Sequence, residues 1–282
     1  MNAVAHTSTD LDSASFREIA ELAYRDSGLI LVDEKRSMVQ SRLRHRLRAL
    51  KLPDFKSYCT FLNTEQGIAE RRKLISALTT NVTHFFRENH HFDRLKEELS
   101  RLLPELKSGG ALRIWSAGCS NGQEALSVAM TLLEHVPEVR NYDVRILATD
   151  IDPEVVAFAR EGIYHERLIA GVPEALLSRY FRKLQTGSEH SYEALPVLKD
   201  MIRVNELNLL APWPMTKKFD VVFCRNVVIY FDVATQETLW PKFQSVLKPQ
   251  GVLFLGHSER IVDPDRFGFH GTGPTTYRPI AA

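Results

Sequence analysis

Two glycines, Gly118 and Gly122, frame a turn that follows a strand-like apolar segment at residues 111–117. Because glycine has no Cβ, the backbone of such a turn can pass close to a ligand. Position 120 is serine, no third glycine follows, and the lysine of a P-loop is missing. The turn therefore indicates a ligand site but gives only weak support for a dinucleotide site.

Two carboxylates follow the next strand-like segment, residues 144–148. An acid at the tip of such a strand accepts hydrogen bonds from both ribose hydroxyls of an adenosine in many nucleotide-binding folds. Asp152 precedes Pro153, and this order is typical of a helix N-cap followed by proline at the first helical position. We therefore expect Asp152 to cap a helix and Asp150 to bind a ribose.

A third motif, Arg225-Asn226, ends the apolar segment 219–224. A buried strand that ends in these residues brings polar groups to the carboxyl edge of a parallel sheet, where open α/β folds bind ligands. Taken alone, Asn226 equally fits an ordinary turn. Together with the other two motifs, it favours a ligand site.

The elements that must position these motifs alternate between strands and helices. Strand-like segments lie at residues 111–117, 144–148, 202–207, 219–224 and 252–255, and helical patterns at residues 123–134, 153–161 and 233–247. The alternation predicts a doubly wound α/β domain over residues 111–282. Pro241 weakens the last helical pattern, because proline removes a backbone donor.

A long connection at about residues 181–207 predicts an inserted β-subdomain. It contains the segment 186–190, typical of a turn, followed by strand-like residues 194–198 and 202–207. Such an insertion is too long for a simple link inside the α/β domain.

The first part of the chain has a helical pattern throughout. Apolar residues recur at helical spacing around residues 16–23, 39–50, 58–62 and 68–78. This pattern predicts a small helical domain over residues 1–90. A helix at about 92–103, then Pro104 and a Gly109-Gly110 loop, predicts a linker over residues 91–110.

Composition excludes several classes of protein. The 282 residues include 36 Lys+Arg and 35 Asp+Glu, a formal net charge of +1, and 44% are hydrophobic, so nothing global indicates a nucleic-acid partner or membrane insertion. The three cysteines form no C-x-x-C pair, which argues against a disulfide framework and a thiolate zinc site. We expect a cytoplasmic protein in a reducing compartment.

Histidines and cysteines near the motifs have ordinary explanations. His84, His90 and His91 lack the acids and spacing of a zinc site, so we expect no metal and place these histidines on a helix surface. Cys119 and Cys224 beside a glycine turn and a strand end suit small apolar packing.

Five ordered motifs give the chain a family resemblance. They are residues 79–88 (TTNVTHFFRE), 115–120 (WSAGCS), 148–152 (ATDID), 223–226 (FCRN) and 255–259 (LGHSE). In this combination the chain resembles the chemotaxis protein-glutamate O-methyltransferases, the CheR family, over roughly residues 12 to 278.

The resemblance implies an S-adenosylmethionine-dependent enzyme with a class I methyltransferase domain. Such enzymes methylate glutamate side chains on the cytoplasmic helices of chemoreceptors and release S-adenosylhomocysteine. In some members the inserted β-subdomain also binds a C-terminal receptor peptide by strand addition, which requires an open sheet edge.

The resemblance also implies the site residues. Those that would contact the cofactor are Asn81, Thr83, Arg87, Gly118, Glu124, Asp150, Asn208, Leu209, Arg225 and Asn226. Arg87 and Tyr230 are the candidates for catalysis, Tyr230 by orienting the incoming carboxylate through its hydroxyl, although it equally fits a core tyrosine. The family commonly has Glu-Glu-Pro-Tyr where this chain has Gln123-Glu124-Ala125-Leu126, so only the second acid is kept.

A run of seven basic residues and no acid extends from Lys35 to Lys51. Its apolar stripe leaves basic side chains on the flanks and outer face of a helix. Four of them would bind the acidic receptor helices, namely Arg42, Arg44, Arg46 and Arg48. The alternative is a solvated basic face neutralised by acids such as Glu18, Glu21 or Glu70.

Methyl transfer to glutamate needs little from the protein, because the carboxylate is already ionised and requires no strong base.

Two other functions stay open at this point. A cofactor-sensing binding module would keep Asp150 and Glu124 without catalysis. A nucleic-acid methyltransferase would need an Asn/Asp-Pro-Pro-aromatic loop, whereas residues 225–228 contain no proline.

Overall fold

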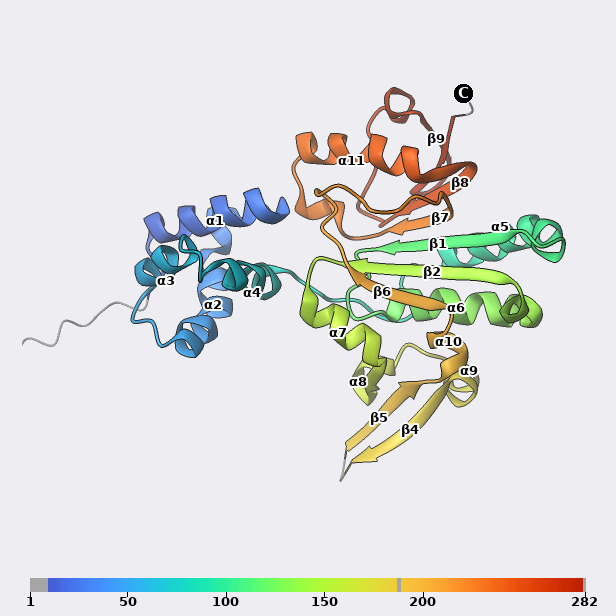
Figure 1. The fold of residues 1–282 in the computed structure, drawn as a ribbon, viewed down its shortest axis with the longest axis horizontal. Coiled ribbons are helices and arrows are strands. Elements are labelled where there is room, and N and C mark those ends of the chain that lie inside the picture. Colours follow the sequence, from blue (N-terminus) through green and yellow to red (C-terminus); the bar gives the residue numbers. More distant parts are fainter. Residues whose placement is uncertain (1–9, 187–188, 281–282) are drawn as a thin grey trace, which may run out of the picture. The chain divides into compact units, whose positions relative to one another are not determined.

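The computed structural model describes residues 10–186 and 189–280, and its contacts divide the chain into two compact units. The first, here called the helical unit, runs to Thr80 and includes Tyr230–Asp232. The second, the sheet unit, comprises Asn81–Ile229 and the chain from Val233 onward (Figure 1). The centre of the turn predicted at 186–190 lies outside the described residues.

Four helices form the helical unit, as the apolar spacing predicts. They are α1 (Ser13–Ser27), α2 (Arg36–Leu50), α3 (Phe55–Leu62) and α4 (Ile68–Leu78), with a 3₁₀ turn at Asp33–Lys35. Asp12 caps α1 by accepting the Ser15 N–H, and Gly28 ends it at a φ of 74°. Buried side chains from all four helices form the core, including Phe16, Leu43, Tyr58 and Leu74.

The sheet unit contains a seven-stranded sheet in the order β6-β2-β1-β7-β8-β10-β9. The five strands predicted for the α/β domain are present, as β1 (Ala111–Ala117), β2 (Asp143–Asp150), β6 (Ile202–Glu206), β7 (Phe219–Cys224) and β8 (Leu247–Leu255). They pair in parallel, and every residue of β7 is buried. Two antiparallel strands that the pattern did not predict, β9 (Phe269–Gly273) and β10 (Thr276–Pro279), extend the sheet.

Helices cover both faces of this sheet. One apolar core joins α5 (His90–Lys107) and α6 (Gln123–His135) to inward residues of the strands such as Ile114 and Phe223. On the other face, Trp115 of β1 packs against Phe243 of α11 (Val233–Val246). The sheet unit is therefore the predicted doubly wound α/β domain. Within the described ranges, no helix is both long enough and apolar enough to span a membrane.

Proline is tolerated inside two helices. The expectation that the helix ends before Pro104 is wrong, because α5 continues to Lys107. Pro104 lies in the last turns, where its missing N–H removes one bond while the Ser108 and Gly110 N–H groups still close the helix end on Pro104 O and Glu105 O. Likewise, α11 runs through Pro241.

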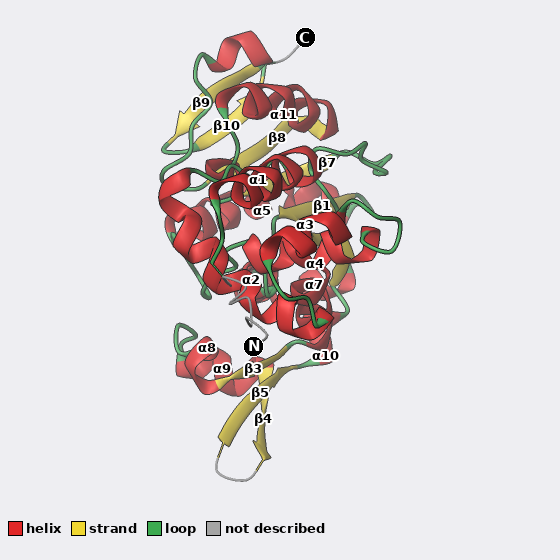
Figure 2. Ribbon diagram, turned by 90° about the vertical axis from the view of Figure 1, so that its left-hand side faces the viewer, coloured by secondary structure: helices red, strands yellow, loops and turns green. Residues whose placement is uncertain are grey.

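A three-stranded antiparallel sheet of order β3-β5-β4 forms the β-subdomain (Figure 2). Its strands are β3 (Ile163–His165), β4 (Phe181–Thr186) and β5 (Glu189–Ala194), accompanied by α8 (Glu166–Ile169), α9 (Glu174–Tyr180) and α10 (Pro196–Lys199). The strand expected at 194–198 is wrong, since proline begins α10 there. Residues 202–206 pair with β2 in the main sheet instead of joining the subdomain.

Candidate functional site

The carboxyl ends of the parallel strands bring the three sequence motifs to one edge of the main sheet. The glycine turn follows β1, Asp150 ends β2, and Arg225 follows β7. Helix α7 (Pro153–Glu161) begins directly after β2. Because neighbouring parallel strands point the same way, their ends form one rim above the sheet, where ligands of doubly wound folds bind.

The glycine turn requires glycine at both framing positions. Gly118 and Gly122 have φ values of 85° and 84°, a region that other residues rarely adopt. A Cβ on Gly118 would overlap with a Val227 methyl group, and one on Gly122 would lie 2.9 Å from the Cβ of Ala159. A hydrogen bond joins the turn to β2, since the Gly118 N–H donates to Thr149 O at 2.8 Å.

Asp150 is 9% exposed and faces backbone donors. Its carboxylate accepts the Ser120 N–H at 2.8 Å and the Asp152 N–H at 3.1 Å. Burial raises the pKa of Asp150, while these two hydrogen bonds act in the opposite direction. Asp152 caps α7 through the Glu154 N–H at 2.9 Å, which confirms the predicted helix cap.

Asn81 lies at this aspartate end of the edge. Its side chain donates to Asp152 at 2.8 Å, and its carbonyl accepts the Ser120 hydroxyl at 3.0 Å. Thr83 is half-buried two residues further along the same segment. Asn81 thus ties the segment before α5 to the loops after β1 and β2.

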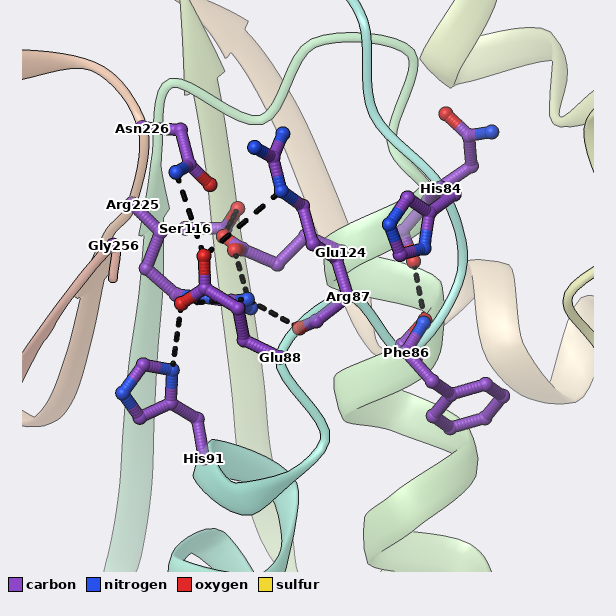
Figure 3. Close-up of polar contacts among 12 residues, drawn as sticks. His84, Phe86, Arg87, Glu88, His91, Ser116, Glu124, Arg225, Asn226 and Gly256 are labelled. Atoms are coloured by element: carbon purple, nitrogen blue, oxygen red, sulfur yellow. Dashed lines mark hydrogen bonds and ion pairs between the residues drawn. The ribbon is translucent and has the colours of Figure 1, made fainter. Parts of the chain in front are cut away.

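A buried charged cluster lies where β7 ends (Figure 3). Arg225, 5% exposed, contacts Glu124 Oε2 at 3.1 Å and Glu88 Oε2 at 3.5 Å, and it donates to the backbone carbonyl of Arg87. Ser116 donates to Glu124 Oε1 at 2.6 Å. We call Arg225, Glu88 and Glu124 the Arg225 cluster.

Burial and neighbouring charges have opposite effects on the pKa values of the two glutamates in the Arg225 cluster. Burial raises the pKa of Glu124, and Arg225 and Ser116 counteract this effect. Burial also acts to raise the pKa of Glu88, but the His257 hydrogen bond at 3.0 Å and the Arg225 charge outweigh it and lower the pKa to about 2. Glu88 is therefore ionised at neutral pH.

His91 is fully buried beside the cluster, contrary to the surface position expected for the histidines. Burial, followed by the charges of Arg225 and His90, lowers the pKa of His91 to about 3, so the ring is neutral at pH 7. Glu88, His90 and His91 bring potential metal ligands within 4.8 Å of one another. Because the Arg225 guanidinium already faces Glu88, we assign no metal to this group.

The remaining predicted cofactor residues lie in three segments, after β6, before α5 and after β7. Asn208 accepts the Leu210 N–H at 2.9 Å, and the carbonyl of buried Leu209 accepts Lys242 Nζ at 2.6 Å. Arg87 donates to Val82 O at 3.1 Å. Asn226 has a φ of 60° and donates its backbone N–H to Glu259 at 2.8 Å.

Tyr230 and the four predicted docking arginines lie in the helical unit. The Tyr230 hydroxyl donates to Thr80 O at 3.4 Å. Arg42 donates to the carbonyls of Leu78 and Thr79 at 2.8 and 2.9 Å, so it braces the end of α4. This contact gives Arg42 a structural partner that the sequence did not indicate.

Arg46 forms a two-pronged ion pair with Glu70, at 2.8 and 2.6 Å. Glu70 is only 4% exposed, so this pair belongs to the interior of the helical unit, whereas the alternative placed such neutralising acids on a solvated face. Arg44 and Arg48 are exposed, and Arg44 lies 3.5 Å from Asp10. Of the four arginines, these two present their charge to solvent.

Comparison with known proteins identifies the family. A family description reading "CheR methyltransferase, SAM binding domain" matches residues 81–274, and one reading "CheR methyltransferase, all-alpha domain" matches residues 14–79. The chain belongs to the CheR methyltransferase family. The sheet unit is therefore the S-adenosylmethionine-binding domain of a methyltransferase.

Curated relatives agree over most of the chain. A probable chemotaxis protein methyltransferase of Rhizobium etli is 45% identical, covering 91% of this chain and 96% of the relative. The chemotaxis protein methyltransferase of Escherichia coli is 40% identical, covering 95% of this chain and 91% of the relative. That of Borreliella burgdorferi is 39% identical, covering 86% and 87%.

Sequence reasoning missed Glu88 and Ser116 as partners of Arg225 and Glu124. Glu88 was visible only as the last letter of a motif, and Ser116 alternates with apolar residues in a strand. The departure at Gln123 does not alter the cluster, because its side chain donates to Leu168 O at 3.3 Å. The acid kept at position 124 is the one that contacts Arg225.

Proposed function

We propose that this CheR-family protein transfers the methyl group of S-adenosylmethionine to glutamate side chains on the cytoplasmic helices of chemoreceptors, forming γ-methyl esters and S-adenosylhomocysteine. The observation that carries the proposal is the Arg225 cluster at the rim that also holds Asp150. The names of the curated relatives support the chemotaxis setting. The proposed substrate places the protein in the cytoplasm.

The residues of the rim fit S-adenosylmethionine chemically. Two carboxyl groups face the single guanidinium of Arg225, and both Arg225 Nε and Glu88 Oε2 are buried without a hydrogen-bond partner among the described residues. The ammonium and carboxylate of an amino acid would complete such a set of charges. Asp150 offers a carboxylate to the ribose hydroxyls.

The chemistry follows from placement. Bound S-adenosylmethionine supplies an electrophilic methyl group on a sulfonium. A substrate glutamate is ionised at neutral pH, so the chain needs no general base to activate it. The chain's own residues have to hold the carboxylate in line and keep water away.

Tyr230 and Arg87 are the residues that we assign to catalysis, Tyr230 to the substrate carboxylate and Arg87 to the cofactor. A Tyr230 hydroxyl that donates to the incoming carboxylate would contribute a charge-assisted hydrogen bond. Tyr230→Phe is then expected to lower kcat by about ten- to a hundredfold and to leave S-adenosylmethionine affinity unchanged. Unchanged kcat would assign the hydroxyl to its Thr80 contact alone.

Two surfaces support recognition of a receptor. Arg44 and Arg48 of α2 present positive charge, which attracts a substrate rich in glutamates. In the β-subdomain, β4 is an outer strand and pairs on one side with β5. An open edge of this kind can accept a receptor C-terminal peptide as an added strand.

Methyl transfer to defined acceptors tests the proposal. The protein is incubated with S-adenosylmethionine labelled in the methyl group and with a receptor cytoplasmic fragment, duplex DNA or RNA. We expect label only on the receptor fragment, and none when its glutamates at the modified sites are changed to alanine. Label on nucleic acid would indicate the nucleic-acid enzyme, and cofactor binding without any transfer would indicate the sensing module.

A further inference from the structure

Another buried carboxylate, that of Glu259, accepts hydrogen bonds from four backbone N–H groups, three of them in the loop that follows β7. Glu259, 4% exposed, follows β8. Its Oε2 accepts the N–H groups of Gly256 at 2.6 Å and Asn226 at 2.8 Å. Its Oε1 accepts those of Val227 at 2.8 Å and Ile229 at 3.2 Å.

These four contacts fix the backbone that follows β7. Asn226 has a φ of 60°, a conformation that costs free energy in a residue other than glycine and is kept only when its surroundings hold it. Both oxygens of Glu259 accept hydrogen bonds from backbone N–H groups of this loop. The carboxylate therefore defines the shape of the loop.

Gly256 is part of the same arrangement. A Cβ at this position would lie 2.7 Å from the Asn226 nitrogen and 2.8 Å from Glu259 Oε2. Real Cβ contacts are not this short, so a side chain here would push the loop and the carboxylate apart. Glycine at position 256 thus permits the close approach of the two loops.

The loop that begins at Arg225 contacts two groups of predicted cofactor-binding residues. At its start, Arg225 contacts Glu124 and Glu88. Two residues later, Val227 packs so closely on Gly118 of the glycine turn that no Cβ fits between them. A shift of this backbone would move the Arg225 cluster and the glycine turn together.

We propose that Glu259 is a positioning residue for methyl transfer, which acts by holding residues 225–229 in the shape that presents Arg225 and Asn226 to S-adenosylmethionine. This inference rests on the proposed function for its effect on kcat, and on the S-adenosylmethionine-binding domain alone for its effect on affinity. Glu259 itself touches neither cofactor nor substrate in this scheme.

Glu259→Gln provides the test. The amide has the same shape, but its NH₂ group would face two of the backbone N–H donors, so the loop has to move. A displacement of about 1 Å can lower a rate by about a hundredfold. We expect a folded protein whose dissociation constant for S-adenosylmethionine rises about tenfold or more and whose kcat falls.

Glu98→Gln is the matched control, since Glu98 is also a buried carboxylate, 5% exposed, but pairs with Arg101 and Arg278 on α5 and β10. The Glu98→Gln variant is expected to have a lower melting temperature than the wild type, with unchanged affinity for S-adenosylmethionine and unchanged kcat. If Glu259→Gln likewise lowers only the melting temperature, the positioning role is wrong. If Glu259→Gln does not fold, Gly256→Ala replaces it, because this change displaces the loop and keeps the carboxylate. The same rise in the dissociation constant for S-adenosylmethionine and the same fall in kcat are expected.

Calorimetry with S-adenosylmethionine separates this inference from the proposed function. If the wild-type protein methylates no receptor fragment, the proposed substrate is wrong, and the affinity of the Glu259 variant still decides whether Glu259 shapes the cofactor site. If the wild type methylates the fragment and the variant retains wild-type affinity and kcat, only the positioning role fails.

Discussion

Asp150 is the residue on which ribose recognition depends in this account. Asp150 is 9% exposed and its carboxylate accepts the N–H groups of Ser120 and Asp152, so each oxygen has acceptor capacity left for a ribose hydroxyl. Asp150→Ala is expected to weaken S-adenosylmethionine binding by about 1–3 kcal/mol, because charge-assisted hydrogen bonds are lost.

Calorimetry of the folded variant checks this expectation. The matched control is Asp143→Ala at the opposite end of the same strand, where the side chain is 51% exposed and pairs with Arg113. Equal cofactor affinities of Asp150→Ala and the wild type would remove Asp150 from the site.

His91 predicts a specific pH dependence of stability. Its pKa is about 3 when folded and 6.5 ordinarily, so between these values the unfolded chain binds one proton more. Stability from the neutral ring is therefore complete above pH 6.5 and declines as the pH falls toward 3. His91→Phe keeps a ring in contact with Phe254 but removes this titration.

Urea unfolding at pH 7.5 and pH 5 measures the effect. The free energy of unfolding of the wild type, relative to His91→Phe, is expected to decrease by about 2 kcal/mol between these two pH values, from 1.5 pH units at about 1.4 kcal/mol each. A difference between the two proteins that does not change with pH would mean that the pKa of His91 is the same in the folded and unfolded states, contrary to the lowered value.

At the scale of elements, α2 divides its arginines between structure and surface. Arg42 and Arg46 bind α4 and its C-terminal end, whereas Arg44 and Arg48 are exposed. Charge reversal at Arg46 would leave Glu70 buried without its guanidinium, and charge reversal at Arg42 would remove the donor to the carbonyls of Leu78 and Thr79, so either change would disturb the helical unit itself. A test of receptor docking therefore has to use Arg44 and Arg48.

The double variant Arg44→Glu/Arg48→Glu is expected to raise the KM for a receptor fragment about two- to thirtyfold at low salt, since two exposed ion pairs contribute about 0.2–1 kcal/mol each. The increase should shrink at high salt, because salt screens exposed charges, and cofactor affinity should stay the same. Arg140→Glu/Arg167→Glu, which makes the same change of net charge on exposed residues of the sheet unit, is the control. An equal KM for both double variants would place the docking surface elsewhere.

The sequence predicted a helix or strand correctly where a local pattern of residues determines it. The buried strands β1 and β7 match their apolar segments residue for residue, and the Asp152-Pro153 pair marks the start of α7. The strand expected at 194–198 failed because Pro196 can begin a helix as readily as it ends a strand pattern. Spacing within α2 also could not show that Arg46 pairs with Glu70, 24 residues away on another helix.

For the whole molecule, the sequence predicted the fold class and the strand ends that form the rim of the sheet. It did not predict which side chains of the site contact one another. Strand ends place Asp150 and Arg225 on one edge by topology alone. The contact between Arg225 and Glu88 joins residues that are 137 positions apart, and only the folded chain brings them together. Family resemblance supplied Glu124, and the structure supplies its partners Ser116 and Arg225.

The product of the proposed reaction is a methyl ester of glutamate, formed without a general base. The most direct measurement follows transfer from S-adenosylmethionine to a receptor cytoplasmic fragment from pH 6 to pH 9 at saturating substrates, then treats the product with alkali and collects volatile methanol. We expect a rate that changes little across this range, because the carboxylate is ionised throughout, and quantitative release of the label as methanol. A rate that rises about tenfold per pH unit would show that a base has to be deprotonated, and label that stays on the fragment after alkali would show that the product is not an ester.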